Sequence, residues 1–222
     1  MNTVLLLGAS RGIGLELARQ YAASGDRVIA TARAPEGMSR LEALGAQALR
    51  LDVTEPASVG ALAGQLDGQR IDIAIYVAGV TSRGDASAPP ARPAFDAVMH
   101  ANVLGAMQVI AHLGPAVAAA GGRMGFVSSA MGRIATADDS HAWVYRASKA
   151  ALNMAVVAAQ STYPGAIMVC LHPGWVQTGM GGARAPLAVP ESCAGLRRVM
   201  AGLTPADRGT FIQYDGQRLD TW

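Results

Sequence analysis

Short apolar runs of strand length alternate along this chain with longer segments whose apolar residues recur at helical spacing. Such alternation predicts an α/β fold, a Rossmann-type doubly wound parallel sheet of about seven strands with helices on both faces. The predicted strands span residues 3–7, 27–32, 47–51, 71–77, 123–127, 166–171 and 209–214. The predicted helices span residues 15–23, 39–44, 56–66, 95–120, 144–163 and 192–201.

Length and composition favour one globular domain over residues 1–222. Apolar residues make up 51% and charged residues 15% of the chain. The net charge of +2 is too small to favour nucleic acid or an anionic membrane, and no apolar run has the ~18 residues of a transmembrane helix. Neither the two cysteines nor the four histidines have metal-ligand or disulfide spacing. We therefore expect a cytoplasmic protein that binds no metal, nucleic acid or membrane.

The turn after the first strand reads G-A-S-R-G-I-G over residues 8–14. Gly8 permits a tight exit from the strand, Gly12 leaves room for a pyrophosphate, and Gly14 lets the helix lie close to the sheet. The following helix presents free N–H groups and the positive end of its dipole to the turn. A glycine-rich turn alone is often only a turn, but the strand before it and the helix after it favour a dinucleotide site.

Basic residues surround the predicted place of the adenosine ribose. The second strand ends at Arg33, and no Asp or Glu lies between residues 28 and 35 to repel a 2′-phosphate. Arg11 adds a second guanidinium, and two such groups suit a phosphate. This predicts NADP(H) in preference to NAD(H), although either arginine alone could be an ordinary solvated charge.

The ends of the third and fourth strands add further candidates for this site. Asp52 could cap the next helix or accept a hydrogen bond from the adenine amino group, and capping by a neighbour such as Thr54 would leave it free for the second task. Ala78 and Gly79 are small enough for a nicotinamide ribose to approach the backbone. The Pro/Ala/Ser/Gly-rich loop over residues 81–93 is expected to be the least ordered part of the chain.

Tyr145 and Lys149 lie four residues apart, so they share one face of a predicted helix. A free tyrosine has a pKa of ~10, and a nearby ammonium group favours the phenolate and lowers that pKa. The pair alone would more often be a surface tyrosine beside a solvated lysine. Ser129, however, ends the fifth strand at the carboxyl edge of the sheet, which is where open α/β sheets bind ligands.

Taken together, these motifs resemble the short-chain dehydrogenase/reductase family of the single-domain type. The matching segments follow the family order along nearly the whole chain: 8–14 (GASRGIG), 52–53 (DV), 78–79 (AG), 102–105 (NVLG), 128–132 (SSAMG), 145–149 (YRASK) and 173–174 (PG). Within the family, residues 172–178 (HPGWVQT) and 211–216 (FIQYDG) resemble the C-factor/sniffer-like carbonyl reductases.

The resemblance implies an NADP(H)-dependent oxidoreductase that reduces a ketone or aldehyde, or oxidises the alcohol. Tyr145 would be the general acid/base, Lys149 would lower its pKa and bind the nicotinamide ribose, and Ser129 rather than Ser128 would hold the substrate oxygen. Asn102 would hold a water that relays protons to Lys149. The residues expected to bind the cofactor are Gly8, Ser10, Arg11, Gly12, Ile13, Gly14, Arg33, Asp52, Val53, Ala78, Gly79, Tyr145, Lys149, Pro173, Gly174, Val176 and Thr178.

Two segments of the chain depart from the family pattern. Tyr76 and Val77 stand where two asparagines are common, which puts the rigidity of the central sheet in doubt. The short Gly/Ala-rich stretch after Thr178 implies a small lid and an open pocket. The two long apolar helices predict a homodimer or homotetramer. A nucleotide-binding signalling or scaffold protein and an epimerase or dehydratase are the alternatives, and the intact Ser/Tyr/Lys/Asn set argues against a scaffold.

Overall fold

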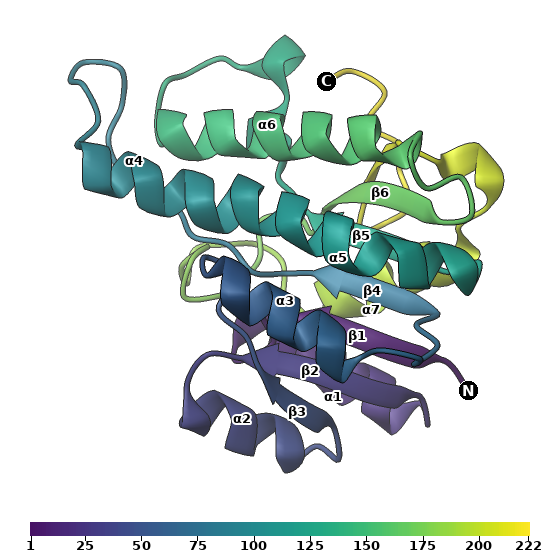
Figure 1. Ribbon diagram of the computed structural model, residues 1–222. Helices are drawn as coiled ribbons and strands as arrows, with labels where there is room; N and C mark the ends of the chain where they lie inside the picture. The colour runs from purple at the N-terminus through teal and green to yellow at the C-terminus, as the bar shows by residue number, and fades with distance from the viewer.

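Seven parallel strands form one sheet in the computed structural model, which describes residues 1–222 (Figure 1). Their order is β3-β2-β1-β4-β5-β6-β7, so the chain builds outward from β1 first on one side and then on the other. The predicted Rossmann-type fold is confirmed. The strands are β1 (Thr3–Leu7), β2 (Arg27–Ala32), β3 (Gln47–Arg50), β4 (Ile73–Tyr76), β5 (Arg123–Val127), β6 (Ile167–His172) and β7 (Phe211–Gln213).

Helices cover both faces of the sheet (Figure 1). One face carries α1 (Gly12–Ala23), α2 (Pro35–Glu42) and α7 (Val189–Gly202). The other carries α3 (Pro56–Gln65), α4 (Arg92–Met99), α5 (Gly105–Ala119) and α6 (Trp143–Gln160). A π-helical segment, η1 (His100–Leu104), joins α4 to α5, and short 3-10 turns occur at η2 (Ala130–Gly132), η3 (Ile134–Thr136) and η4 (Pro205–Asp207).

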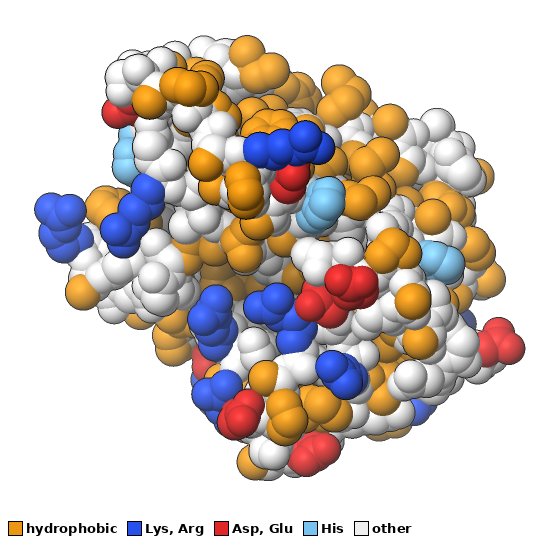
Figure 2. All heavy atoms as spheres, turned by 60° about the vertical axis from the view of Figure 1, so that its left-hand side comes forward, with side chains coloured by type: hydrophobic (Ala, Val, Ile, Leu, Met, Phe, Trp, Pro, Cys, Tyr) orange, Lys and Arg blue, Asp and Glu red, His pale blue; other side chains and the backbone are white.

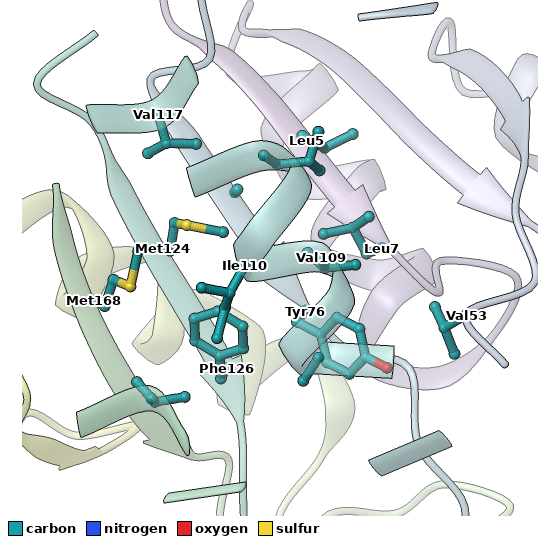
Figure 3. Packing of buried hydrophobic residues seen from close by; sticks show 14 of the residues in the cluster. Leu5, Leu7, Val53, Tyr76, Val109, Ile110, Val117, Met124, Phe126 and Met168 are labelled. Carbon is teal, nitrogen blue, oxygen red and sulfur yellow. The ribbon is translucent and has the colours of Figure 1, made fainter. Parts of the chain in front are cut away.

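The central strands are apolar on both sides because both sides are covered. Leu5 and Leu7 of β1 point into the core beneath α3, α5 and α6, whereas Val4 and Leu6 point into the core beneath α1, α2 and α7. This division follows from the strand period of two residues. Figure 3 shows the first of these cores, where Leu7 lies near the ring of Tyr76.

Several predicted boundaries shift for local reasons. The helix predicted at 39–44 occupies Pro35–Glu42, because Pro35 suits a first helical turn and Glu36 favours its positive end. The helix predicted at 144–163 ends at Gln160, whose side-chain amide donates to the carbonyls of Tyr163 and Ala166 and so redirects the chain.

The helix predicted at 95–120 is longer than expected. It runs from Arg92 to Ala119 through η1, and its length and hydropathy of 1.3 would allow it to cross a membrane. Half of its most apolar window is buried inside the protein, where Val109, Leu113 and Val117 pack on the sheet. It therefore has the burial of a core helix.

All seven strands point their carboxyl ends to the same edge of the sheet, because all neighbouring pairs are parallel. Figure 2 faces this edge and shows a hollow with an apolar interior and several Lys or Arg side chains along its lower side. The loops that follow the strands surround this hollow, so residues far apart in sequence meet there.

Candidate active site

Tyr145 and Lys149 occupy the first two turns of α6. The Lys149 ammonium lies 5.6 Å from the centre of the Tyr145 ring, so the two side chains share a face as predicted. Opposite them is the η2 turn, where a Cβ atom added at Gly132 would lie 2.8 Å from the Lys149 backbone carbonyl carbon. The backbone of α6 can therefore lie directly on the turn that carries Ser129 only because residue 132 is glycine.

Ser129 caps the η2 turn, and its Oγ accepts a hydrogen bond from Met131 N at 3.1 Å. The Tyr145 phenol lies near the same hydroxyl group. Burial raises the pKa of Tyr145, and hydrogen bonding with Ser129 partly opposes this rise. The net effect is opposite to the predicted lowering by Lys149, and it keeps the phenol protonated at neutral pH.

Lys149 is buried, and its Nζ donates a hydrogen bond to the Val127 carbonyl at 2.8 Å. Burial lowers the pKa of this ammonium group to about 8. At pH 7 most molecules therefore still carry the charge, in a position where the surrounding protein screens it poorly.

Asn102 lies in η1, and both N–H groups of its amide are used within the protein. Nδ2 donates to the Val80 carbonyl and to Ser148 Oγ, both at 2.9 Å, and Oδ1 accepts from Val80 N at 2.8 Å. A Cβ atom added at Gly79 would lie 3.1 Å from Asn102 Oδ1 and 3.6 Å from Lys149 Nζ, so Asn102 and Lys149 meet at the end of β4. The side chain ties the segment that follows β4 to α6.

Tyr76 supplies the rigidity that the missing asparagine put in doubt. Its ring is buried beside Phe126 (Figure 3), and its hydroxyl group donates to the Ala101 carbonyl of η1 at 2.6 Å. A Cβ atom added at Gly105 would lie 2.6 Å from this hydroxyl oxygen. The tyrosine and the glycine therefore form a matched pair that fixes η1, and with it Asn102.

We expect Tyr76→Phe to lower the free energy of unfolding by about 1–3 kcal/mol, because the buried Ala101 carbonyl loses its partner. Chemical denaturation of the purified variant measures this change. Tyr163→Phe, a change to a half-buried tyrosine whose ring lies against Gly114 of α5, is the control and should cost less than about 0.5 kcal/mol. Equal losses in the two variants would show that the Tyr76 hydroxyl group does not brace η1.

The glycine turn has the geometry that its sequence predicts. Gly8 has φ +92° and Gly12 has φ +54°, values that favour glycine. A Cβ atom added at Gly14 would lie 2.4 Å from the Gly8 carbonyl oxygen. No side chain caps the first turn of α1, where Arg11 is the N-cap residue, so backbone N–H groups there are available to an anion.

Arg33 and Asp52 lie together at the ends of β2 and β3, with Arg33 Nη1 at 3.6 Å from Asp52 Oδ2. Asp52 is not left free as predicted, because Thr54 does not cap α3 and instead donates its N–H and hydroxyl to Asp52 Oδ1. Burial acts to raise the pKa of Asp52, but the Thr54 hydrogen bonds and the Arg33 charge outweigh it and hold that pKa below its usual value. Arg33 remains largely exposed at this edge, and so does Arg11.

The remaining predicted cofactor residues also follow strand ends. Thr178 lies beside the glycine turn, since its Cγ2 would be 3.5 Å from a Cβ atom added at Gly12. Val176 is buried, and the Pro173 carbonyl accepts a hydrogen bond from Ser192 Oγ at 2.6 Å. Val53 buries its side chain in the core (Figure 3). The other predicted residues of this group are Ser10 and Ile13 after β1, Ala78 after β4 and Gly174 after β6.

Sequence reasoning missed residues that hold the site together. Ser148 links Asn102 to the Tyr145 carbonyl, to which its Oγ donates at 2.7 Å. Ala142, the residue before α6, has φ +55° and is the one non-glycine residue with positive φ, held by a hydrogen bond from its N–H to Gly84 O. Ser128 and Asn153 form a further buried pair. A glycine would have signalled the backbone of residue 142, but an alanine gives no such signal.

The parallel sheet and the glycine turn at its carboxyl edge define a nucleotide-binding α/β protein, and the adjoining serine, tyrosine and lysine form its candidate acid/base site. A sequence model of the family described as short chain dehydrogenase matches residues 2–186. The chain belongs to this family, a family of oxidoreductases, as its motifs predicted.

Individual proteins agree with this membership. C-signal of Myxococcus xanthus is 43% identical over 121 residues, which are 53% of this chain and 73% of that protein. A carbonyl reductase from Pseudomonas aeruginosa PAO1, solved in complex with NADP, is 34% identical, with a TM-score of 0.88 over 100% of both chains. The carbonyl reductase Sniffer of D. melanogaster is 27% identical, with a TM-score of 0.91 over 100% of both chains. The predicted likeness to C-factor and sniffer-like proteins is confirmed.

Proposed function

We propose that this protein is an NADP(H)-dependent reductase of a ketone or aldehyde, which can also run as the alcohol dehydrogenase. The observation that carries the proposal is the meeting of Ser129, Tyr145 and Lys149 at the carboxyl edge of the sheet, beside the glycine turn. A protein that only held a nucleotide would have no need of a buried phenol and ammonium at this place. Membership of the short chain dehydrogenase family and the NADP complex of the Pseudomonas enzyme support it.

The residues at this edge fit the dinucleotide. The positive φ of Gly8 and Gly12 shapes the turn, and the uncapped first turn of α1 offers N–H groups to a pyrophosphate. Arg11 and Arg33 offer guanidinium groups to a 2′-phosphate. Asp52 lies close enough to Arg33 to orient it for this purpose. When bound here, NADPH would supply the hydride for the carbonyl carbon.

The protein's own groups act on the carbonyl oxygen. Ser129 donates a hydrogen bond to this oxygen and holds it next to Tyr145. Tyr145, kept protonated by burial, gives its phenolic proton to the same oxygen as negative charge develops there. Both groups therefore stabilise the transition state more than the ground state.

Lys149 acts from the other side of Tyr145. Its buried charge favours the phenolate that remains after proton transfer, and its ammonium group can hold the nicotinamide ribose. Asn102 fixes the loop at Val80 and the first turns of α6, and it would hold a water that relays protons to Lys149.

A panel of ketones and aldehydes, assayed with NADPH and NADH in parallel, tests the proposal. Consumption of NADPH that depends on an added carbonyl compound supports reduction. Binding of NADPH without turnover across the panel would favour the scaffold alternative. Formation of product with no net change in the cofactor would favour an epimerase or dehydratase.

The same protein also has a candidate surface for self-association. Figure 1 shows α6 beside the long helix of α4 and α5, and exposed apolar side chains occur on these elements: Phe95, Leu104, Met107, Met154 and Val157. We infer that this face pairs with a second copy in a homodimer or homotetramer.

Met107→Asp tests the surface, because Met107 is 50% exposed and a charge there would be buried by the partner. We expect light scattering after size-exclusion chromatography to show a smaller assembly. Ser39→Asp adds the same charge on α2, across the sheet, and should keep the wild-type mass. An unchanged mass for Met107→Asp would place any interface elsewhere.

A further inference from the structure

A buried hydrogen bond between Ser128 and Asn153 lies next to the residues of the acid/base site. Ser128 Oγ donates to Asn153 Oδ1 at 2.6 Å, and each residue is 2% exposed. Ser128 is the neighbour of Ser129, the serine expected to hold the substrate oxygen. Asn153 belongs to none of the family motifs. Neither side chain has a part in the chemistry proposed above.

The place of this pair in the fold is informative. Asn153 lies one helical turn beyond Lys149, on the same face of α6. Ser128 lies between Val127, whose carbonyl accepts a hydrogen bond from Lys149, and Ser129, whose hydroxyl group lies near the Tyr145 phenol. Two consecutive residues at the end of β5 thus form hydrogen bonds with successive turns of α6, and the next residue, Ser129, lies near the turn before them.

Ser128 is also where the chain leaves the sheet. Its N–H still donates to Leu171 O of β6 at 2.8 Å, and the next residue begins the η2 turn. Beyond this point the direction of the backbone depends on side-chain contacts. The hydrogen bond to Asn153 anchors Ser128, the last residue here that is bonded to β6, on α6. It therefore helps to set the position of the next residue, Ser129, and of its hydroxyl group.

The pair is poorly explained by stability alone. Asn153 Nδ2 is buried and has no hydrogen-bond partner, which costs free energy. Two apolar side chains of similar size would fill the same space without that cost. A polar pair that is only partly satisfied is expected where geometry matters more than stability.

We propose that Ser128 and Asn153 are positioning residues, which hold Ser129 in register with Tyr145 and Lys149 through the hydrogen bond between β5 and α6. This inference rests on the proposed carbonyl reduction, since it names residues that act through the Ser129 hydroxyl group. It gives Ser128, the first serine of the S-S-A-M-G segment, a role distinct from that of Ser129, the second.

The double variant Ser128→Ala/Asn153→Leu separates position from stability. Removing both partners of a buried hydrogen bond together costs little stability, so its denaturation midpoint should stay close to that of the wild type. We expect kcat for carbonyl reduction to fall by about 10-fold or more, because a misplacement of about 1 Å can cost up to 100-fold. Gln160→Leu, at the far end of α6, is the control and should leave kcat unchanged.

The pH profile of alcohol oxidation gives a readout that a purely structural role would not move. Oxidation needs the Tyr145 phenolate, and hydrogen bonding with Ser129 lowers the pKa of Tyr145. With Ser129 displaced, the rate of alcohol oxidation by the double variant should rise at a higher pH than the rate of the wild type does. A loss of kcat smaller than about 10-fold, with an unshifted profile, would overturn the proposal.

Failure of the reductase function would be recognised separately, because the wild type itself would then reduce no carbonyl in the panel. Crystal structures of the wild type and of the double variant would still decide the present inference. The Ser129 hydroxyl group should move away from the Tyr145 phenol in the variant. An unmoved Ser129 would overturn the positioning role.

Discussion

Tyr145→Phe should lower kcat/KM for NADPH-dependent carbonyl reduction by about 1,000-fold, while the protein stays folded and binds NADPH. The substitution removes only the hydroxyl group that gives its proton to the carbonyl oxygen. Burial holds this proton on the phenol at neutral pH, so in the wild type the proton is available to the carbonyl oxygen. Steady-state kinetics with the best substrate of the panel measures the loss.

Tyr214→Phe provides a control at another tyrosine near the same edge, where the ring packs against Gly174. It should retain activity to within about 3-fold, because a half-buried ring without a catalytic proton contributes mainly packing. If Tyr145→Phe keeps more than about a tenth of the wild-type kcat/KM, Tyr145 is not the acid and another group must supply the proton.

Arg33→Ala should lower the affinity for NADPH by about 10- to 100-fold and change the affinity for NADH by less than about 2-fold. Hydrogen bonds to a charged phosphate contribute about 1.5–3 kcal/mol, and only NADPH has the 2′-phosphate that Arg33 would bind. Titration of each cofactor by calorimetry or fluorescence measures the two affinities.

Arg27→Ala is the matched control, because Arg27 begins the same strand that Arg33 follows and contacts Gln47 and Gln69 at the opposite edge of the sheet. It should leave both affinities unchanged. Equal losses of affinity for NADPH and NADH in Arg33→Ala would mean that this arginine does not select between the two cofactors. The pairing of Arg33 with Asp52 would then be its main role.

The fold could be read from the sequence because its signals are local. Each strand is an apolar run with a turn at its carboxyl end, and β1, β2 and β5 begin and end where the pattern placed them. The glycines at positions 8, 12 and 14 signal backbone geometry directly, and the structure gives each of them the positive φ or close approach that was expected.

The supporting contacts could not be read in the same way, because they join residues distant in sequence. Tyr76 bonds to Ala101, and Ser128 bonds to Asn153, each across 25 residues. Tyrosine in an apolar strand and asparagine in an amphipathic helix are both ordinary, so the sequence around neither residue predicts its hydrogen-bond partner. Capping of α3 by Thr54 was predicted wrongly for a related reason, since the local pattern did not show whether Thr54 would cap α3 or bind Asp52. Binding of adenine by Asp52 stays a prediction.

The most direct test of the central claim follows the hydrogen atom itself. NADPH deuterated on the transferred position is incubated with the enzyme and a reactive carbonyl from the panel, and the product is analysed by mass spectrometry and NMR. Reduction through Tyr145 predicts an alcohol with deuterium on the former carbonyl carbon, formed by the wild type and lost in Tyr145→Phe. An alcohol without deuterium, or equal labelling by Tyr145→Phe, would contradict it.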